Sequence, residues 1–529
     1  MDLKLPKITF WKVVAALIFA GGLYATIVRF AMGLGASTNL TDIFPWGIWI
    51  GFDVLVGVGV AAGGFVIAAT VHIFHLEKYE PIARPTILTA FLGYSLVVVA
   101  LMFDLGRPYR IWHPLIMWNP HSVMFEVGWC VTLYTIVLAL EFSPIVFEKF
   151  NLKLPMKLIR SIYLPIVIVG VLLSTLHQSS LGTLYVLVPD KLHGLWYSPL
   201  LPLFFFIHAI AAGLAMTIFE SFLSYRAFGK RLEHDILAGL GRVIVVVLAV
   251  YFVFKFQDLH GRGNLPLVFE FTRQSVMFWG EIGLGVLLPM ALLFSARVRA
   301  KESGLFLSAL LVLVGFIVSR LNVSITGMLN SETYVPKWTE FAVTIAIVAL
   351  GFVIFGYAVK YFPVFPKEEM EEAKHIKAAM HAEKKRHPVF SGNVVMAMWA
   401  LVLVGTITYA FTANYEKKHN GTATDGNSVS RAIDPMDQEL ALPEDITFPL
   451  GEGSPGRVTF SHQSHVLMQE TPTCATCHAE GGFSILKADS AHKQPLLMEP
   501  MYNGESCGKC HNGEAAFSSE DCQSCHIEQ

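Results

Sequence analysis

The sequence predicts an all-α chain, in which polytopic transmembrane helical bundles of about eleven helices precede a small C-terminal domain. Of the 529 residues, 54% are hydrophobic and only 15% are charged, whereas soluble proteins have about 25% charged residues. The hydrophobic residues concentrate between Phe10 and Ala413, and six of the seven cysteines lie in the polar remainder. A net charge of −2 gives no indication of nucleic-acid binding.

Apolar runs long enough to cross a bilayer define the predicted helices, since a spanning helix needs about 17–25 residues. They lie at 11–32, 47–75, 85–104, 122–145, 158–178, 199–221, 236–256, 275–296, 304–321, 339–362 and 393–413. The first run is long and lacks a small-residue cleavage site, so we do not interpret it as a signal peptide.

Lysine and arginine residues in the connections predict the orientation, because cytoplasmic loops carry the excess of both. Such residues occur at the N-terminus and in alternate connections: Lys4, Lys7, Lys12, Lys149, Lys153, Lys157, Arg160, Arg226, Lys230, Arg231, Arg297, Arg299, Lys301, Lys374, Lys377, Lys384, Lys385 and Arg386. The N-terminus is therefore expected to be cytoplasmic, and an odd number of crossings places the C-terminus outside.

The motif C-x-x-C-H occurs three times in the C-terminal domain: Cys474-Cys477-His478, Cys507-Cys510-His511 and Cys522-Cys525-His526. In this motif both thiols bond a porphyrin and the histidine binds its iron. A disulfide framework or zinc knuckles are the alternatives, but neither needs a histidine after each second cysteine. The sequence therefore predicts three covalently bound haem c groups. Cys130 lies apart, in an apolar helix, and is interpreted as a packing residue.

The rest of the C-terminal domain contains three more histidines, His462, His465 and His492. Their number matches the second axial positions of three haems, which predicts bis-His ligation. A domain of about 70 residues has little core of its own, so we expect it to be packed around its haems. Haem c is attached on the outer side of bacterial cytoplasmic membranes, which agrees with the predicted periplasmic C-terminus.

The run Val458-Thr-Phe-Ser-His462-Gln-Ser-His465 resembles the class III multihaem cytochromes, in particular their triheme members. The resemblance implies that His462 completes the haem at Cys474/Cys477, His465 the one at Cys507/Cys510 and His492 the one at Cys522/Cys525. It also implies low-potential haems that relay electrons.

Ionisable residues in apolar helices are costly and usually functional. With the predicted orientation, one group lies near the outer ends of the helices and forms a candidate quinone site: Asp104, Arg107, His177 and Gln178, with Asp53 and Glu126 as second choices. For Asp104 and Arg107 an intramembrane salt bridge is an equally good interpretation. Glu281 and Glu340 are candidates for a proton path.

Several motifs resemble the membrane subunits of the NrfD/polysulfide-reductase family, and most closely its ten-helix, hydrogenase-2-like branch. They are Pro45-Trp46-Gly47-Ile-Trp49, Gly63-Gly64, Phe103-Asp104-Leu-Gly-Arg107-Pro108, Trp112-His113-Pro, Asn119-Pro120, His177-Gln178-Ser-Ser-Leu-Gly182 and Leu195-Trp196-Tyr197-Ser-Pro199-Leu-Leu-Pro202. The resemblance implies a haem-free subunit with a quinone site near the outer face, within a four-helix bundle of the early helices. It also implies an iron–sulfur subunit as partner.

Four segments follow from these observations. Residues 1–363 form the NrfD-like membrane domain, 364–413 a cytoplasmic loop and an additional helix, 414–456 a linker, and 457–529 the triheme domain. The fusion suggests that the haems replace or supplement a separate electron-carrying subunit.

The predicted function is electron exchange between a membrane quinone pool, menaquinone by family analogy, and periplasmic c-type haems. The protein would be a subunit of a quinol:cytochrome c-type oxidoreductase complex, with periplasmic cytochromes among its partners. The alternative is a redox-coupled proton-translocating subunit. Haem b is not expected, because His72, His75, His177 and His208 offer no pair at matching depth.

Overall fold

The computed structural model divides the protein into two compact units, residues 1–423 and 424–529. In the first unit it describes residues 10–41, 44–229, 232–329, 331 and 334–365. In the second it describes residues 445–448, 454–467, 498–503, 507, 511–513, 518, 521 and 526–527.

Ten helices of the first unit are long and apolar enough to cross a membrane. They are α1 (Phe10–Met32), η1–α3–α4 (Trp49–Val54, Leu55–Val60, Gly63–His72), η2–α5 (Glu77–Tyr79, Glu80–Asp104), α7 (Val123–Lys149), α8 (Lys153–Val186), α9 (Leu201–Phe228), α10 (His234–Gly261), α11–η6–α12 (Arg273–Trp279, Gly280–Leu287, Leu288–Phe294), α14–η7 (Glu302–Leu321, Asn322–Thr326) and α15 (Trp338–Tyr361). They confirm ten of the eleven predicted spans. The eleventh, 393–413, lies outside the described residues.

Short helices occupy the connections: α2 (Leu34–Ser37), η3 (Pro108–Arg110), α6 (His113–Ile116), η4 (Pro189–Lys191), η5 (Leu265–Val268) and α13 (Ala296–Arg299). Helix ends follow local chemistry. The Ser122 hydroxyl accepts the Phe125 N–H at the start of α7, and Gly229 ends α9 in the left-handed conformation, at φ 76°.

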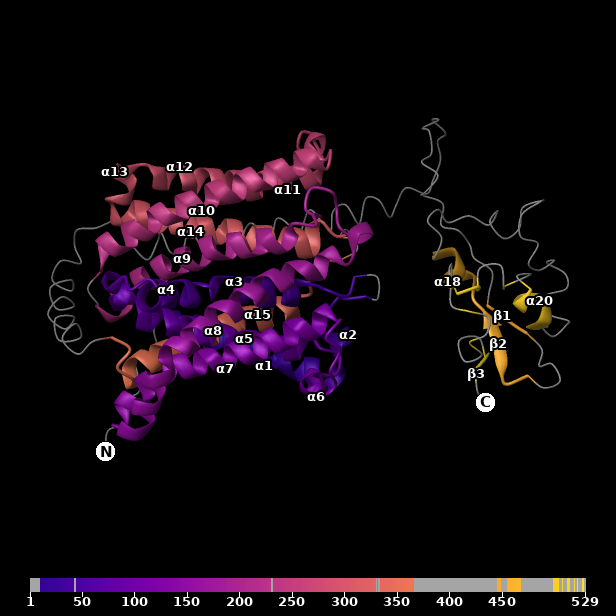
Figure 1. Cartoon of the computed structure of the whole chain (residues 1–529), viewed down its shortest axis with the longest axis horizontal. Helices are drawn as coiled ribbons and strands as arrows, with labels where there is room; N and C mark the ends of the chain where they lie inside the picture. Colours follow the sequence, from indigo (N-terminus) through magenta and orange to yellow (C-terminus); the bar gives the residue numbers. More distant parts are fainter. Residues whose placement is uncertain are drawn as a thin grey trace. The chain divides into compact units, whose positions relative to one another are not determined.

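The spanning helices form two groups of four (Figure 1). The first bundle consists of η1–α3–α4, α5, α7 and α8, and the second bundle of α9, α10, α11–η6–α12 and α14–η7. Helices α4 and α8 pack on α9 and join the bundles, while α1 pairs with α15 beside α5. Glycine permits the closest approach between the bundles, because a Cβ on Gly213 would lie 2.3 Å from the backbone nitrogen of Gly63.

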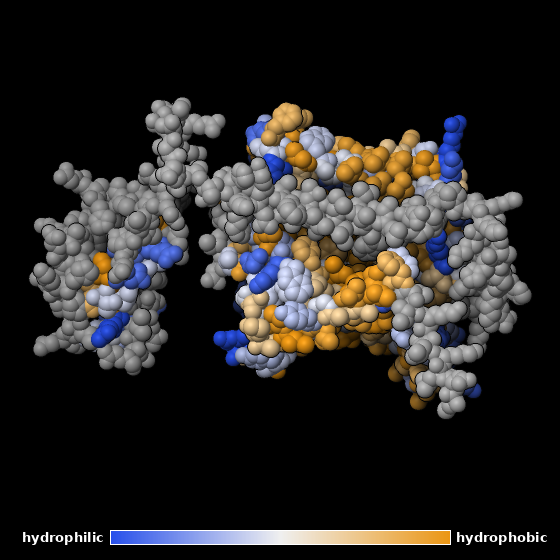
Figure 2. Space-filling model, turned by 180° about the vertical axis from the view of Figure 1, so that it is seen from behind, coloured by the Kyte–Doolittle hydropathy of each residue, from blue (hydrophilic) through white to orange (hydrophobic). Residues whose placement is uncertain are grey.

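The helical unit has two ends, the Trp46 end and the Lys149 end. The Trp46 end carries the connections 33–48, 105–122, 187–200, 262–272 and 327–337, and the Lys149 end carries 73–76, 150–152, 229–233 and 295–301. Figure 2 shows an apolar surface along the middle of the helices, with hydrophilic residues towards both ends. This distribution is typical of a membrane-spanning bundle.

The second unit contains a three-stranded antiparallel sheet in the order β1 (Ile446–Thr447), β2 (Arg457–Phe460), β3 (His526–Ile527). Ile446 lies opposite Phe460, and Val458 lies opposite His526. Two short helices accompany it, α18 (His462–Leu467) and α20 (Met498–Tyr502). Strand β1 lies within residues 414–456, which the sequence predicted to be a linker. The strand was not predicted because two residues have no periodicity that a sequence pattern can reveal.

Candidate functional site

His177 is the central polar residue of the first bundle at its Trp46 end. Its ring is completely buried on α8, and its Nδ1 lies 3.0 Å from the Tyr94 hydroxyl on α5. Its Nε2 is buried and has no hydrogen-bond partner in the described part of the protein. A buried polar atom without a partner is costly, so this nitrogen is suited to contact a ligand.

Other polar atoms of the first bundle are also buried without a hydrogen-bond partner among the described residues. Tyr134 packs edge-on against Tyr94 at 4.6 Å between ring centres. Its hydroxyl, the Ser174 hydroxyl and Oε2 of Glu141 are all buried without a partner among the described residues. These groups extend from His177 toward the Lys149 end on α7 and α8.

Asp104 ends α5 at the Trp46 end, and its Oδ1 is also buried without a described partner. The alternative salt bridge to Arg107 is wrong for the described residues, since Arg107 is exposed and no ion pair joins the two. The cation beside Asp104 is instead Arg29 of α1. Its guanidinium donates to the carbonyls of Phe103 and Leu105, at 2.6 Å each, and so caps α5.

The remaining predicted quinone-site residues have partners. The Gln178 amide donates to the Val58 carbonyl at 3.0 Å, and the Thr344 hydroxyl donates to Asp53 at 2.8 Å. Glu126 is exposed and accepts the Ser180 hydroxyl at 2.5 Å. The structure therefore brings Glu126 of α7 to Ser180 of α8, three residues from His177, and leaves Arg107 at the surface.

Glu281 lies in the second bundle, also towards the Trp46 end, and its carboxylate accepts three hydrogen bonds. Its carboxylate accepts the Trp196 indole N–H at 2.9 Å, the Asn322 amide at 3.0 Å and the Tyr251 hydroxyl at 3.3 Å. Glu281 lies in the π-helix η6, and Asn322 begins the π-helix η7. Such π-turns are rare and occur frequently at functional sites.

Glu340 is fully buried at the start of α15. It accepts the backbone N–H groups of Asn39 and Lys337 at 3.0 and 2.9 Å, and the Tyr334 hydroxyl at 2.5 Å. Burial, with the Glu340 carboxylate beside it, raises the pKa of Tyr334, which lies between the spans. These contacts are those of a helix-capping carboxylate.

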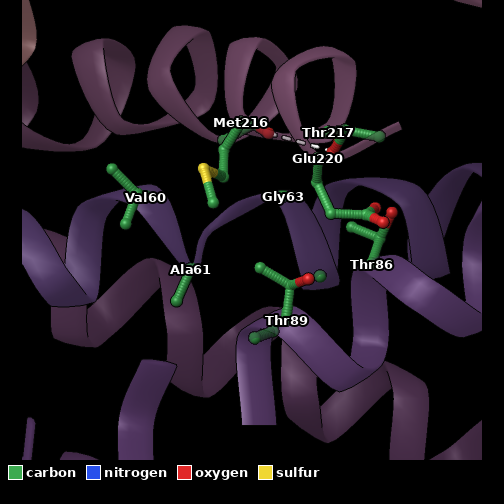
Figure 3. A pocket seen from close by; sticks show the side chains of 11 residues that line it. Val60, Ala61, Gly63, Thr86, Thr89, Met216, Thr217 and Glu220 are labelled. Carbon is green, nitrogen blue, oxygen red and sulfur yellow. Dashed lines mark hydrogen bonds between the residues drawn. The ribbon is translucent and has the colours of Figure 1, made fainter. Parts of the chain in front are cut away.

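A small cavity, in which the volume open to a water molecule is about 0 Å³, lies between α3–α4, α5 and α9 (Figure 3). Met216 and Glu220 come from α9, and Thr86 and Thr89 from α5. Ligand pockets usually measure about 300–1,000 Å³. This cavity is therefore too small for a quinone.

The second unit brings together two histidines predicted to bind the same haem. The ring centres of His465 and His511 are 6.1 Å apart, at 67° between the ring planes. Two imidazoles that each bind a metal at about 2 Å hold their ring centres on the order of 6 Å apart. These residues therefore fit an iron with two axial histidines.

Backbone carbonyls orient two of the predicted axial histidines. His465 Nδ1 lies 2.9 Å from the Ser461 carbonyl, and His526 Nδ1 lies 2.9 Å from the Gly456 carbonyl. An Nδ1–H that donates to a carbonyl fixes the tautomer in which Nε2 carries the metal-binding lone pair. Phe460 packs on His462 and His465, at 5.0 and 4.3 Å between ring centres.

Several predicted haem residues lie outside the described residues: Cys474, Cys477, His478, His492, Cys510, Cys522 and Cys525. Their roles stay predictions. The third distal candidate, His462, has a buried Nδ1 without a hydrogen-bond partner in the described segments.

The sequence interpretation did not select Tyr94, Tyr134, Glu141, Tyr185 or Lys255. Glu141 and Lys255 are ionisable residues inside predicted spans, a signal that could have found them. The tyrosines carry no comparable signal, because tyrosine is ordinary in apolar helices. Only the packing of α5 against α7 and α8 brings Tyr94 to His177.

Known proteins resemble both units. The family model described as "Polysulphide reductase, NrfD" matches residues 36–331, and the model "Cytochrome c7 and related cytochrome c" matches residues 458–527.

Three curated relatives align with the membrane part. A protein of Nitratidesulfovibrio vulgaris is 37% identical over 366 residues, 66% of this chain and 93% of the relative. The probable Ni/Fe-hydrogenase 2 b-type cytochrome subunit of Escherichia coli is 36% identical, over 64% of this chain and 88% of the relative. The menaquinone reductase integral membrane subunit of N. vulgaris is 27% identical, over 69% and 94%. The chain therefore belongs to the NrfD family of multi-pass membrane proteins, and it carries a C-terminal multihaem domain of the cytochrome c7 type.

Proposed function

We propose that the protein is a membrane subunit of a quinone-linked redox complex, and that the quinone site lies in the first bundle at the Trp46 end. The single observation that carries this proposal is the buried, unpartnered Nε2 of His177. A quinone carbonyl exchanges a proton as well as electrons, and an imidazole can donate to it or accept from its hydroxyl. The names of two relatives, which include the words menaquinone reductase and polysulfide reductase, support this reaction class.

His177 would contact the quinone directly, while Tyr94 holds its Nδ1. Asp104 and Tyr185 each have a buried oxygen without a partner in the described spans, and both lie at the same end. Glu126 and Ser180 form a polar pair one turn from His177. Gln178 and Asp53 would support the site through their own helix contacts, and exposed Arg107 would lie at its rim.

The quinone would exchange electrons with three haem c groups in the second unit. Six histidines would hold them in pairs: His462 with His478, His465 with His511, and His492 with His526. Each haem, when bound, would accept or release one electron at a time. The relatives favour menaquinone as the quinone, since two of their names mention menaquinone or menaquinol.

The proposed orientation places the N-terminus in the cytoplasm, and the Trp46 end and the haems in the periplasm of a bacterial cell. An iron–sulfur subunit and periplasmic cytochromes are the proposed partners. Although one relative is named a b-type cytochrome subunit, we expect no haem b in this protein. In the described spans, His177 packs on Tyr94 and His208 on Tyr251, and neither lies against another histidine.

The decisive experiment uses the detergent-solubilised complex. A pyridine haemochrome assay should give three haems per polypeptide, and the ferric spectrum should be low-spin. A menaquinol analogue, added anaerobically, should then reduce the haems. A high-spin spectrum would contradict bis-His ligation. Failure of quinols to reduce intact haems, together with failure of reduced haems to reduce the quinone, would contradict the quinone link.

Proton translocation is the second candidate function. The observation that favours it is the set of buried carboxylates inside the membrane unit, of which Glu281 and Glu340 were the predicted path residues. Because the contacts of Glu340 are those of a helix cap, Glu281 is the stronger of the two. Proton uptake or release by proteoliposomes during quinol oxidation distinguishes this function from scalar electron exchange.

A further inference from the structure

The second bundle contains a buried group of charged residues with unequal signs. Arg320 and Lys255 are each 2% exposed and Glu281 is 1% exposed. They come from α14, α10 and η6, which pack together beside α9 (Figure 1). Two cations thus accompany one carboxylate in a region that the membrane surrounds, where an uncompensated charge is costly.

Arg320 and Glu281 have hydrogen-bond partners that suit permanent charges. The Arg320 guanidinium donates to the Phe205 carbonyl at 3.0 Å and lies 3.7 Å from the centre of the Phe205 ring. Glu281 receives three donors. Arginine keeps its proton in proteins, and hydrogen bonds to a carboxylate favour the ionised form. Their charges cancel, and Lys255 is the remaining cation.

Lys255 differs from both neighbours in its contacts. Its Nζ lies 5.2 Å from the centre of the Phe204 ring. No salt bridge in the described part of the protein involves Lys255. A buried amine without a carboxylate partner gives up its proton more readily than an arginine would.

A polar route leads from Lys255 to the Trp46 end. Asp258 lies one turn further along α10, so it lies on the same helix face. Asp258 accepts the Ser198 hydroxyl at 2.8 Å and pairs with Arg262 at 2.6 Å. The charged groups that act on Lys255 are Glu281, Asp258 and Arg262. Arg320 and Lys255 both act on His208, and the His208 ring stacks on Tyr251 with 4.5 Å between the ring centres.

We propose that Lys255 is a proton-loading residue of the second bundle. Its ammonium releases one proton through the Asp258–Ser198 pair to the Trp46 end and becomes a neutral amine, which later binds another proton. Arg320 and Glu281 stay charged throughout. This proposal rests on the second candidate function and names its proton carrier.

The test uses the whole complex in liposomes, with a pH-sensitive dye and quinol as the electron source. Lys255→Met removes the proton site, Lys255→Arg keeps a charge that cannot be released, and exposed Lys191→Met is the matched control. Both Lys255 variants should lose the protons released beyond those of quinol oxidation itself, while haem reduction stays within about twofold of wild type. Lys191→Met should keep both.

Wild-type proton release by Lys255→Arg would overturn the proposal, and this variant retains the buried charge even where Lys255→Met does not assemble. Wild-type liposomes that release only the protons of quinol oxidation would also overturn it. In that case quinol-driven haem reduction would leave the quinone function intact. Loss of haem reduction in the wild type would instead refute the quinone function.

Discussion

The two bundles of the membrane unit differ in how their buried polar groups are satisfied. In the first bundle, polar atoms on α5, α7 and α8 lack partners in the described structure, among them His177 Nε2, Tyr134 OH and Glu141 Oε2. In the second bundle, Glu281 receives three hydrogen bonds and Asp258 forms an ion pair. An exception there is His208 on α9, whose two ring nitrogens are also buried without a partner among the described residues. Unpartnered atoms suit a site that waits for a substrate, whereas saturated ones suit fixed charges.

The sharpest way to break this comparison is a matched pair of histidine variants. His177→Ala should lower quinol-dependent haem reduction by about 100-fold or more, because a proton-transfer group contributes roughly 10²–10⁴. His208→Ala, in the second bundle, should change the rate by less than about threefold. Stopped-flow absorbance of the haem bands measures both rates. Equal rates in the two variants would remove His177 from the site.

A stability comparison gives the next largest effect. Glu281→Leu leaves three donors without their acceptor, which should lower the free energy of unfolding by about 2–4 kcal/mol. Tyr134→Phe removes a hydroxyl without a described partner and should change stability by less than about 0.5 kcal/mol. Thermal melts of the two variants in the same detergent test the difference. A large loss for Tyr134→Phe would show that its hydroxyl is used in the folded protein.

Tyr94→Phe sharpens the assignment of His177. The change removes the hydroxyl that holds Nδ1, and one hydrogen bond of about 1 kcal/mol corresponds to a rate loss on the order of fivefold to tenfold. The apparent KM for quinol and kcat, measured with haem content as control, show whether the loss affects quinol affinity or turnover. Tyr251→Phe is the matched variant in the second bundle and should leave both constants near their wild-type values.

The smallest effect concerns the connection 187–200, which joins the two bundles. Burial lowers the pKa of His193, with Glu270 opposing the shift in part, and the Leu195 N–H donates to its Nδ1 at 3.3 Å. The unfolded protein therefore binds a proton more readily, so stability is lost as pH falls below about 6.5. The melting temperature of His193→Gln should fall less than that of wild type between about pH 7.5 and 5.5. Parallel curves would contradict this role.

The sequence was sufficient for the helices, because membrane-spanning length is a local pattern, and apolar length located ten spans. The predicted pairing of His465 with His511 stays a prediction, which agrees with the 6.1 Å between their ring centres. The site in the first bundle was predicted only as a region. Tyr94 and Arg29 reach their partners through helix packing, which no local pattern encodes.

Arg107 and Glu340 have contacts that the sequence did not predict, and each has a physical reason. Arg107 follows the end of α5 and extends to the surface, while Arg29 of the distant helix α1 supplies the cation beside Asp104. Glu340 looked like an isolated intramembrane carboxylate, yet it lies in the first turn of α15, where it caps backbone N–H groups. A carboxylate near the end of a predicted span is therefore weaker evidence for proton transfer than one at mid-helix.

The pairing of β2 with β3 has a consequence for how the protein matures. Strand β2 precedes Cys474, and β3 contains His526 of the last haem motif. The two strands therefore enclose all three motifs in one loop of the polypeptide. The three-stranded sheet can form only after the last motif has been translated, so under the proposed function haem insertion would begin on an open polypeptide. A polypeptide stalled before His526 would carry the first two motifs but lack the strand that closes the domain.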